Sequence, residues 1–366
     1  MKYLATVVPG LEEVSAAELR KFGAKVLKIR KNKGRIIFEG NKDLWKKLNF
    51  FSRSLERIIM LFDIKIINNF DLKTIYNCVY SIEWENLLDP GKTFAVKTTR
   101  HGEHPITSME IAGISGQAII DRYLKEKNKR LKVNLNNPDT IVRVDLIENQ
   151  LFIGIDTTGE EGLQKRKYRV YNHPAHLNSC IAYSLIKLSG YEKNKCLLDP
   201  MCGSGTIPIE ASMFVRKIPP GKFDSKRRFG FRWKEHYFND LEIYGIEKFK
   251  KHYLGAIKNA ESAGVYKNIN FINKDCLKYL STTSDNYDCI VFNPPYGIRI
   301  GKKNIVRKLY FKLFDILKTF KGSTVSLITT EKNIMGKIIN EMKYQILNIR
   351  YVKYGGLDTW VYVLHI

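Results

Sequence analysis

The sequence predicts an α/β fold for the C-terminal half of this 366-residue chain and smaller α+β modules for its N-terminal half. From residue 196 onward, short apolar runs alternate with helical stretches, as in a mostly parallel sheet covered by helices on both faces. Before residue 160, strands and helices form two α+β modules, the first of which has the strand, helix, hairpin and helix order of a ferredoxin-like module. The length suits two or three domains, and we place their boundaries at 1–64, 65–160, 161–192 and 193–366.

The first module, 1–64, is predicted from a strand, a helix, a hairpin and a second helix. An apolar run leads through Pro9-Gly10 into a helical stripe that Gly23 ends, and Asn32-Lys33-Gly34 forms the turn of the hairpin. The expected elements are strand 3–8, helix 11–22, strands 26–29 and 35–38, and helix 44–49.

The second module, 65–160, combines predicted helices at 72–80 and 111–124 with predicted strands at 93–98, 141–147 and 150–156. The run 97–104 follows a strand and carries several donors that are only lightly balanced by acid. This composition suits contact with phosphates, so Arg100 is a candidate RNA-binding residue. The alternative is a solvated loop without a ligand.

A third region, 161–192, is predicted to link the two halves and to contain a helix. Its segment 163–169 interleaves four cations with one tyrosine, a pattern that grips a nucleic-acid backbone and stacks a base. Lys165, Arg166 and Arg169 are the candidate contacts, and a solvated charged face is the alternative. His173 and His176 lack a visible third ligand, so we expect no metal site.

The C-terminal half, 193–366, repeats strand, turn and helix. The predicted strands are 196–198, 243–247, 269–272, 289–292, 324–328, 346–351 and 360–364, with helices through 209–214, before 263 and at 309–317.

Acidic residues end three of these strands, and a glycine turn follows the first. Gly203 and Gly205 form a GxG turn after Asp199, which lets backbone N–H groups approach a ligand closely. Glu247 suits the hydroxyls of a ribose, and Asp275 suits the amine of an adenine. No Walker lysine follows the turn, and an acid there disfavours phosphates and favours a sulfonium and an ammonium. These features predict S-adenosylmethionine as cofactor.

A fourth strand ends in Asn293-Pro294-Pro295-Tyr296. An asparagine oxygen and a proline carbonyl can accept both N–H groups of an exocyclic amine, and the tyrosine can stack on the base that carries it. Asn293, Pro294 and Tyr296 are therefore the candidate catalytic residues. The alternative for the tetrapeptide alone is a polar turn after a strand, and the glycine turn upstream argues against it.

The charge indicates a polyanionic partner. The chain has 61 Lys and Arg against 37 Asp and Glu, a net charge of +24, which favours nucleic acid over the alternative of a merely lysine-rich surface. Basic and aromatic residues interleave in 217–240, where Arg227 and Arg228 are candidate contacts; a packing insertion is the alternative. Lys302 and Lys303 follow the tetrapeptide and are candidates to hold phosphates beside the target base.

The cysteines show no CxxC pair and no disulfide framework, so we expect reduced thiols and a cytoplasmic protein. The start lacks the apolar core of a signal peptide. The longest charge-free run, 170–186, is too polar to span a bilayer. We expect no membrane association. The oligomeric state is open, with a monomer slightly favoured.

The stretch Leu198 to Ile207, together with Asn293 to Gly297, resembles the class I S-adenosylmethionine-dependent methyltransferases of the THUMP-containing RNA guanine-N2 family. The segments 4–13, 84–96, 163–169 and 173–178 are also similar to that family, so the resemblance covers nearly the whole chain. It implies an N-terminal ferredoxin-like domain, a THUMP domain that grips the 3′ end of RNA, and a Rossmann-like methyltransferase domain whose last strands form an antiparallel hairpin.

The resemblance also implies roles for single residues. The methionine end of the cofactor would be held by Asp199, Gly203, Ser204, Gly205 and Thr206. The ribose would be held by Glu247 and the adenine by Asp275 and Cys276, while Asn293 would bind both the cofactor and the target amine. Glu247 replaces the Asp of many methyltransferases and keeps the same role.

The expected function is methylation of tRNA at the N2 of a guanosine. The Asn form of the tetrapeptide resembles the enzymes that act on guanosine 6 of the acceptor stem, an analogy only. The first alternative is the same chemistry on ribosomal RNA. Weaker alternatives are an adenine-N6 nucleic-acid methyltransferase and an RNA-binding protein with a catalytically silent methyltransferase fold.

Overall fold

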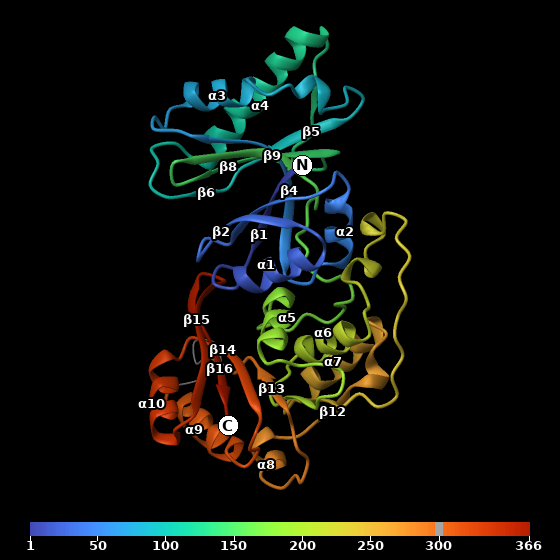
Figure 1. Cartoon of the computed structure of the whole chain (residues 1–366), viewed down its shortest axis with the longest axis vertical. Coiled ribbons are helices and arrows are strands. Elements are labelled where there is room, and N and C mark those ends of the chain that lie inside the picture. The colour runs from blue at the N-terminus through green and yellow to red at the C-terminus, as the bar shows by residue number, and fades with distance from the viewer. Residues whose placement is uncertain (297–302) are drawn as a thin grey trace.

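A computed structural model describes residues 1–296 and 303–366 of the chain. It contains two sheets, one in each half of the molecule, which follow one another along the longest axis (Figure 1). Within the described residues, no helix is both long and apolar enough to cross a membrane.

The N-terminal sheet is one continuous sheet of nine strands, in the order β2-β3-β1-β4-β9-β8-β5-β7, with β6 also paired to β8. Its strands are β1 (Lys2–Val7), β2 (Lys25–Arg30), β3 (Arg35–Glu39), β4 (Leu55–Ile66), β5 (Thr93–Lys97), β6 (Arg100–His101), β7 (Lys132–Val133), β8 (Thr140–Ile147) and β9 (Gln150–Asp156). Its helices are α1 (Glu12–Lys21), α2 (Leu44–Phe51), α3 (Leu72–Tyr80), the 3₁₀ turn η1 (Trp84–Asn86) and α4 (Ser108–Lys127).

The long strand β4 joins the two N-terminal modules. Its first half pairs with β1, for example Met60 with Tyr3, and its second half pairs with β9, for example Lys65 with Leu151. The boundary predicted at 64/65 therefore falls inside one strand. Strand β4 was not predicted, because its apolar residues run continuously over 58–62 and show no clear period.

The C-terminal sheet has seven strands in the order β12-β11-β10-β13-β14-β16-β15. These are β10 (Leu197–Asp199), β11 (Ile243–Ile246), β12 (Asn270–Ile272), β13 (Cys289–Phe292), β14 (Thr324–Thr329), β15 (Gln345–Tyr354) and β16 (Leu357–His365). The first five in that order are parallel, and β16 is antiparallel to both β14 and β15. The expected terminal antiparallel hairpin is thus present.

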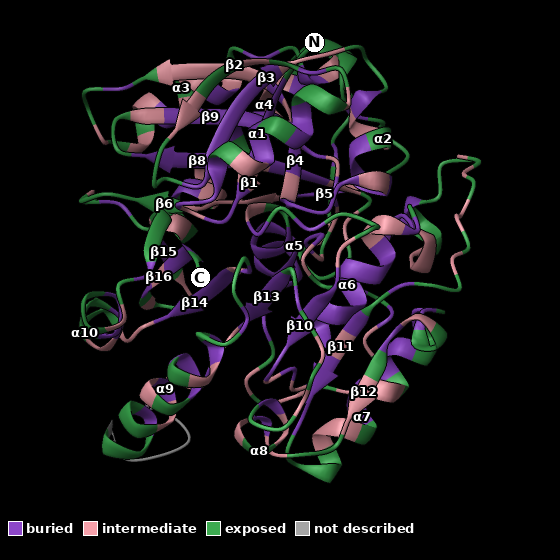
Figure 2. Cartoon of the chain, turned by 60° about the horizontal axis from the view of Figure 1, so that its bottom comes forward, coloured by how far each residue is buried: buried purple, intermediate pink, exposed green. Residues whose placement is uncertain are grey.

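Helices cover both faces of this sheet. They are α5 (Ser179–Leu188), α6 (Thr206–Val215), α7 (Lys250–Ser262), α8 (Cys276–Leu280), α9 (Lys303–Leu317) and α10 (Lys332–Met342), with 3₁₀ turns η2 (Pro220–Phe223), η3 (Ser225–Arg227) and η4 (Tyr266–Asn268). Leu197 packs with α5 and α6 on one face, and its neighbour Leu198 packs with α9 on the other. Figure 2 shows β10, β11 and β13 buried between these layers.

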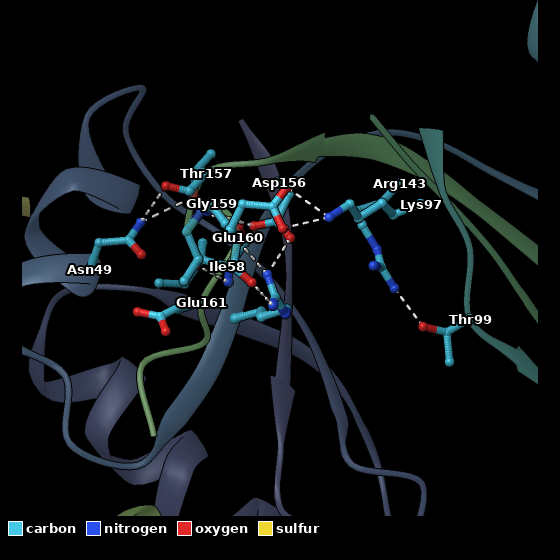
Figure 3. Close-up of polar contacts among 12 residues, drawn as sticks. Asn49, Ile58, Lys97, Thr99, Arg143, Asp156, Thr157, Gly159, Glu160 and Glu161 are labelled. Carbon is cyan, nitrogen blue, oxygen red and sulfur yellow. Dashed lines mark hydrogen bonds and ion pairs between the residues drawn. The ribbon is translucent and has the colours of Figure 1, made fainter. Parts of the chain in front are cut away.

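The turn that leaves β9 is fixed by polar contacts with the first module (Figure 3). Arg57 Nη1 donates to Asp156 Oδ2 at 2.8 Å and to the carbonyl oxygen of Gly159 at 2.6 Å. Asn49 Nδ2 donates to Thr157 Oγ1 at 3.1 Å. The chain therefore enters the linker region in a defined direction.

The insertion 217–240 packs against α2. Phe231 and Trp233 lie 5.5 and 5.2 Å from the ring centroid of Phe50, and a Cβ at Gly221 would lie 2.7 Å from the Phe50 backbone. Its aromatic residues therefore serve packing between the two halves, which was the alternative to an RNA-channel wall.

Candidate active site

Four polar residues lie in a row at the carboxyl edge of the C-terminal sheet. Because β12, β11, β10 and β13 are adjacent and parallel, the residues at or just after their carboxyl ends meet at one edge. In that order they are Asp275, Glu247, Asp199 and Asn293. The strand order reverses direction beside β10, and such a switch point is where open α/β sheets bind ligands.

Asp199 is the most deeply buried of the four, with 2% of its surface exposed. Its Oδ1 accepts a hydrogen bond from the N–H of Met201 at 3.0 Å. Burial raises the pKa of this carboxyl well above its ordinary value, and the charge of Glu247 adds to the effect. A positively charged ligand beside it would favour the ionised form.

The turn after Asp199 requires its glycines. Gly203 and Gly205 have φ values of +55° and +78°, in the left-handed region that favours glycine. A Cβ at Gly205 would also lie 3.1 Å from the Cβ of Ala256 and 3.2 Å from the ring of Phe271. The turn delivers the chain directly into the N-terminus of α6 at Thr206, so free backbone N–H groups face the same edge of the sheet.

Glu247 bridges two turns of the backbone. Its Oε2 accepts from the N–H of Gly203 at 3.1 Å, and its Oε1 accepts from the N–H of Phe249 at 2.7 Å. Burial raises its pKa, although both hydrogen bonds act in the opposite direction. Each oxygen keeps a second lone pair for a hydroxyl group.

Asp275 caps helix α8, which Cys276 begins. Its Oδ1 accepts from the N–H of Leu277 at 3.0 Å, and its Oδ2 lies 3.0 Å from Lys248 Nζ. Burial of Asp275 acts to raise its pKa, but the hydrogen bond from Lys248 leaves the pKa below its ordinary value. Cys276 is buried, and burial raises the pKa of its thiol to about 12.

Asn293 and Tyr296 contact each other within the target loop 293–296. The hydroxyl of Tyr296 donates to Asn293 Oδ1 at 2.5 Å. Tyr310 on α9 donates to the carbonyl oxygen of Pro295 at 3.4 Å and shares a 2.7 Å hydrogen bond with Thr329. Burial and the nearby Tyr354 raise the pKa of Tyr296, so its hydroxyl stays neutral.

The linker region is tied to the glycine turn through Asn259 on α7. Its side-chain oxygen accepts from the N–H groups of Val170 and Tyr171, and its amide group donates to the carbonyl oxygens of Tyr171 and Ser204. Ser204 and Thr206 are themselves buried.

His173 lies beside the turn. Its ring is 3.9 Å from where a Cβ at Gly203 would be, and 4.1 Å from the ring centroid of His252. Burial, reinforced by His252, lowers the pKa of His173 to about 4. The ring is therefore neutral near pH 7. No cluster of potential metal ligands occurs in 1–296 or 303–366.

The residues predicted to contact RNA differ in how far they are exposed to solvent. Arg100, Lys165 and Arg228 are exposed. Arg169 is half-buried and donates to Leu177 O and Ser179 Oγ, both at 3.2 Å. Lys302 lies outside the described residues, as does the side chain of Lys303.

Arg166 and Arg227 correct the prediction, because both side chains are buried within the protein. Arg166 pairs with Glu210 on α6, and Arg227 donates to the backbone oxygens of Thr158 and Glu161. Their cations hold the two halves of the chain together and are not available to RNA.

Sequence reasoning missed Glu210, Asn259 and Tyr310. Glu210 carried a signal, since it is the only charged residue in the otherwise apolar helix α6. Asn259 and Tyr310 carried none, because their roles depend on partners far away in the sequence.

The donor set at this edge fits S-adenosylmethionine. A buried carboxylate suits its cationic methionine end, a bridging carboxylate suits its ribose, and the turn holding Gly203 and Gly205 allows the close approach of a ligand. The three acceptors lie at the ends of adjacent parallel strands, and the loop 293–296 follows the neighbouring strand β13.

Comparison with known proteins agrees with this geometry. Residues 2–59 match the model of the RlmL ferredoxin-like domain, 69–156 that of the THUMP domain, and 166–359 that of the RMKL-like methyltransferase domain. The chain is 42% identical to a tRNA (guanine(6)-N2)-methyltransferase of Methanocaldococcus jannaschii, with both chains fully covered. It is 41% identical to one of Archaeoglobus fulgidus, covering 100% of this chain and 92% of that protein.

More distant relatives share the same fold. The ribosomal RNA large subunit methyltransferase K/L of Buchnera aphidicola is 32% identical over 87% of this chain and 48% of its own length. The crystal structure of SMU.472 complexed with SAH superposes with a TM-score of 0.85 at 25% identity, covering 100% of this chain and 97% of that one. The family and this neighbour confirm S-adenosylmethionine as the cofactor and the predicted domain types in their order. The chain therefore belongs to the RMKL-like family of S-adenosylmethionine-dependent methyltransferases, in the form that carries ferredoxin-like and THUMP domains before the catalytic domain.

Proposed function

We propose that this enzyme methylates the N2 of guanosine 6 in the acceptor stem of tRNA. The identity to two archaeal enzymes named for this reaction supports the substrate. The observation that carries the chemistry is the position of Asn293, at the end of the strand next to Asp199. This position sets an amine-binding loop beside the cofactor turn.

The target loop would make an exocyclic amine a better nucleophile. Such an amine is a weak nucleophile because the lone pair of its nitrogen is delocalised into the purine ring. When Asn293 Oδ1 and the carbonyl oxygen of Pro294 accept its two N–H groups, the nitrogen is held with its lone pair directed out of the ring plane. Asn293 cannot take up a proton at ordinary pH, so the proton that the nitrogen loses passes to water.

The hydroxyl of Tyr296 already occupies Asn293 Oδ1. The amine must therefore share or replace this hydrogen bond when the base enters. Tyr296 holds the asparagine side chain in one orientation before binding, and its ring provides a stacking surface for the base, worth about 1 to 3 kcal/mol.

We propose that Asp199, the turn from Gly203 to Thr206, and Glu247 hold the methionine and ribose parts of the cofactor. Asp275 and Cys276 would hold the adenine. The bound cofactor supplies a methyl group made electrophilic by its sulfonium. Asp199 is itself shielded from water, which strengthens its attraction for a nearby cation.

The domains divide the task between them in this proposal. The N-terminal domains, 1–64 and 65–160, would hold the tRNA through its 3′ end. The region 161–192 would link them to the catalytic domain, 193–366. The enzyme would act in the cytoplasm as a monomer. Among the predicted contacts, Arg100, Lys165 and Arg228 are the exposed cations suited to RNA.

Tritiated methyl transfer into purified tRNA and into ribosomal RNA tests this function. We expect labelling of tRNA, with N2-methylguanosine at position 6 found by nuclease digestion and mass spectrometry. A tRNA carrying inosine at that position, which lacks only the N2 amine, should accept no label. Transfer to the inosine tRNA at an equal rate would contradict the assignment of the target atom.

Ribosomal RNA is the second candidate, favoured by the K/L relative. Preferential labelling of ribosomal RNA would replace tRNA as the substrate and leave the chemistry of the target loop unchanged.

A further inference from the structure

Six cations gather where three parts of the chain meet. They come from the β2–β3 hairpin, from β6 and β8 of the THUMP domain, and from the tip of the β15–β16 hairpin of the catalytic domain. We call them the junction strip: Arg30, Lys33, Arg35, Arg100, Arg143 and Lys353.

Short contacts make the N-terminal part of the strip continuous. Glu148, in the turn between β8 and β9, pairs with Lys33 at 2.7 Å and with Arg30 at 3.1 Å. The N–H of Glu148 donates to the carbonyl oxygen of His101, next to Arg100, at 2.7 Å. The hairpin of the first domain and the edge of the THUMP domain therefore present one surface.

The catalytic hairpin adjoins the same surface. Glu12 accepts from the N–H groups of both Gly10 and Gly34, at 2.9 Å each, and so ties the loop after β1 to the β2–β3 turn. A Cβ added at Gly10 would clash with the backbone carbonyl of Tyr351 on β15. The β2–β3 turn that carries Lys33 and strand β15 that carries Lys353 therefore both pack against the loop after β1.

Positive charge exceeds negative charge along the strip. Against its six cations stand the carboxylates of Asp145, Glu148 and Asp358, which neighbour Arg143, Lys33 and Lys353. Burial lowers the pKa of His101, and the cations Arg35, Lys353 and Lys33 lower it further. The three cations acting on one histidine come from two domains, so their fields overlap there.

Several buried donors of the strip have no acceptor among the described residues. They are Arg30 Nη1, Arg35 Nε and Arg143 Nε. Arg143 reaches Thr99 through its terminal nitrogen (Figure 3), which leaves Nε unpaired. Arg30 and Arg143 are paired with carboxylates through their other nitrogens, so only these single N–H groups lack an acceptor. A buried N–H group without an acceptor is costly, and the field of a nearby anion would offset part of that cost.

The strip ends at Lys353, one residue before the end of β15 at Tyr354. Tyr354, next to Lys353, is close enough to Tyr296 to raise its pKa. The hydroxyl of Tyr354 also contacts Asn178 N and His176 O, both at 3.2 Å. In Figures 1 and 2 the upper part of β15 and strand β6 lie on the same side of the molecule.

We propose that the junction strip binds backbone phosphates of the RNA that runs from the THUMP domain to the target loop. The inference rests on RNA being the substrate. Arginine and lysine side chains neutralise backbone phosphates whatever the base sequence of the RNA. The strip thereby fixes how far the target base lies from the end that the THUMP domain holds.

The test replaces the three exposed cations together, as Lys33→Ala, Arg100→Ala and Lys353→Ala. The matched control is Lys258→Ala, Lys267→Ala and Lys321→Ala, which removes the same charge from exposed positions on α7, η4 and the turn before β14. A charge-conserving variant, Lys33→Arg, Arg100→Lys and Lys353→Arg, completes the set. All are assayed for tRNA affinity across salt concentrations, for steady-state methylation, and for S-adenosylhomocysteine binding by calorimetry.

We expect the strip variant to reduce the slope of log affinity against log salt by about 2 to 3, since each phosphate contact contributes roughly 0.7 to 0.9. Its KM for tRNA should rise while kcat at saturating tRNA stays near that of the unmodified enzyme. The charge-conserving variant should retain most of the affinity, and cofactor binding should be unchanged throughout.

A strip variant whose slope and KM equal those of the control, in an enzyme that methylates tRNA, would overturn the strip and leave the proposed function standing. Failure of the unmodified enzyme to bind or methylate any RNA would instead overturn the proposed function.

Discussion

Tyr296 has two separable contributions, a ring and a hydroxyl. In the proposed mechanism the ring stacks on the target base, and the hydroxyl orients Asn293 through a 2.5 Å hydrogen bond. Tyr296→Phe keeps the ring, so we expect it to retain most activity. Tyr296→Ala removes both, and we expect kcat/KM for RNA to fall by about 5- to 150-fold, the equivalent of about 1 to 3 kcal/mol of stacking. Single-turnover methylation measures both variants, and equal losses would argue against stacking.

Asp199 makes cofactor binding dependent on pH. Burial raises the pKa of its carboxyl in the free enzyme, whereas a bound cation favours the carboxylate, so the pKa is lower in the complex. Affinity for S-adenosylmethionine is therefore full at high pH and decreases as pH falls through the raised pKa. Calorimetry from pH 8 to 5 should show this decrease.

Asp199→Asn separates this carboxyl from other titrating groups at the site. The variant should bind the cofactor more weakly at pH 8 and lose the part of the pH dependence that Asp199 causes. An unchanged profile in Asp199→Asn would assign the titration to another group, such as Glu247.

At the scale of elements, the turn between β10 and α6 is constrained both by conformation and by space. Gly205→Ala introduces a Cβ at positive φ, which costs about 1 to 2 kcal/mol, and presses it against Ala256 and Phe271. Gly264→Ala is a matched control, because its φ is +69° and nothing lies within 4 Å of the added Cβ.

We expect both variants to lose unfolding free energy in urea, and Gly205→Ala to lose more, by about 1 to 3 kcal/mol of overpacking. Cofactor affinity should fall only in Gly205→Ala. An equal loss of unfolding free energy in the two variants would show that Ala256 on α7 and Phe271 on β12 can move away from the added Cβ at position 205.

At the scale of the whole molecule, one buried carboxylate joins three parts of the chain. Glu210 is fully buried on α6. It lies 2.9 Å from Arg166 Nε in the linker, 3.0 Å from the hydroxyl of Tyr168 and 3.8 Å from Arg53 Nη1 in the first domain. This cluster fixes how the RNA-binding half sits on the catalytic half.

Removing the charge of Glu210 should therefore destabilise the molecule as a unit. Glu210→Gln leaves two buried guanidinium groups without their counter-ion, and we expect a loss of about 3 to 5 kcal/mol. Glu261→Gln, an exposed acid on α7, should change stability by less than about 0.5 kcal/mol. Equal midpoints of denaturation for the two variants would contradict the structural role of Glu210.

Local sequence patterns were sufficient to predict elements and turns whose structure depends on a single segment of the chain. Helix α3 and strand β9 were predicted at their observed bounds, because a regular apolar period fixes the exposed and buried faces of an element. The glycine turn after Asp199 and the target loop were likewise predicted, since each is a short run with demanding backbone or side-chain chemistry.

Features that depend on contacts between residues far apart in the chain could not be predicted from the sequence. Strand β4 was missed, and the two N-terminal modules were expected as separate units, because strand pairing is not encoded in local periodicity. Arg166 and Arg227 resembled RNA contacts for the same reason: a cation in a basic run looks identical whether it faces solvent or a buried carboxylate.

The sequence by itself determined the class of fold, the family and the cofactor, since these depend on short motifs at the ends of strands, and it located the loop 293–296 that we propose to bind the amine. Only the tertiary structure decided which cations remain available to RNA, how the halves are locked through Glu210, and that Tyr296 holds Asn293. These outcomes depend on burial and on contacts between residues far apart in the chain, and the free energy of a charged group is set by those surroundings.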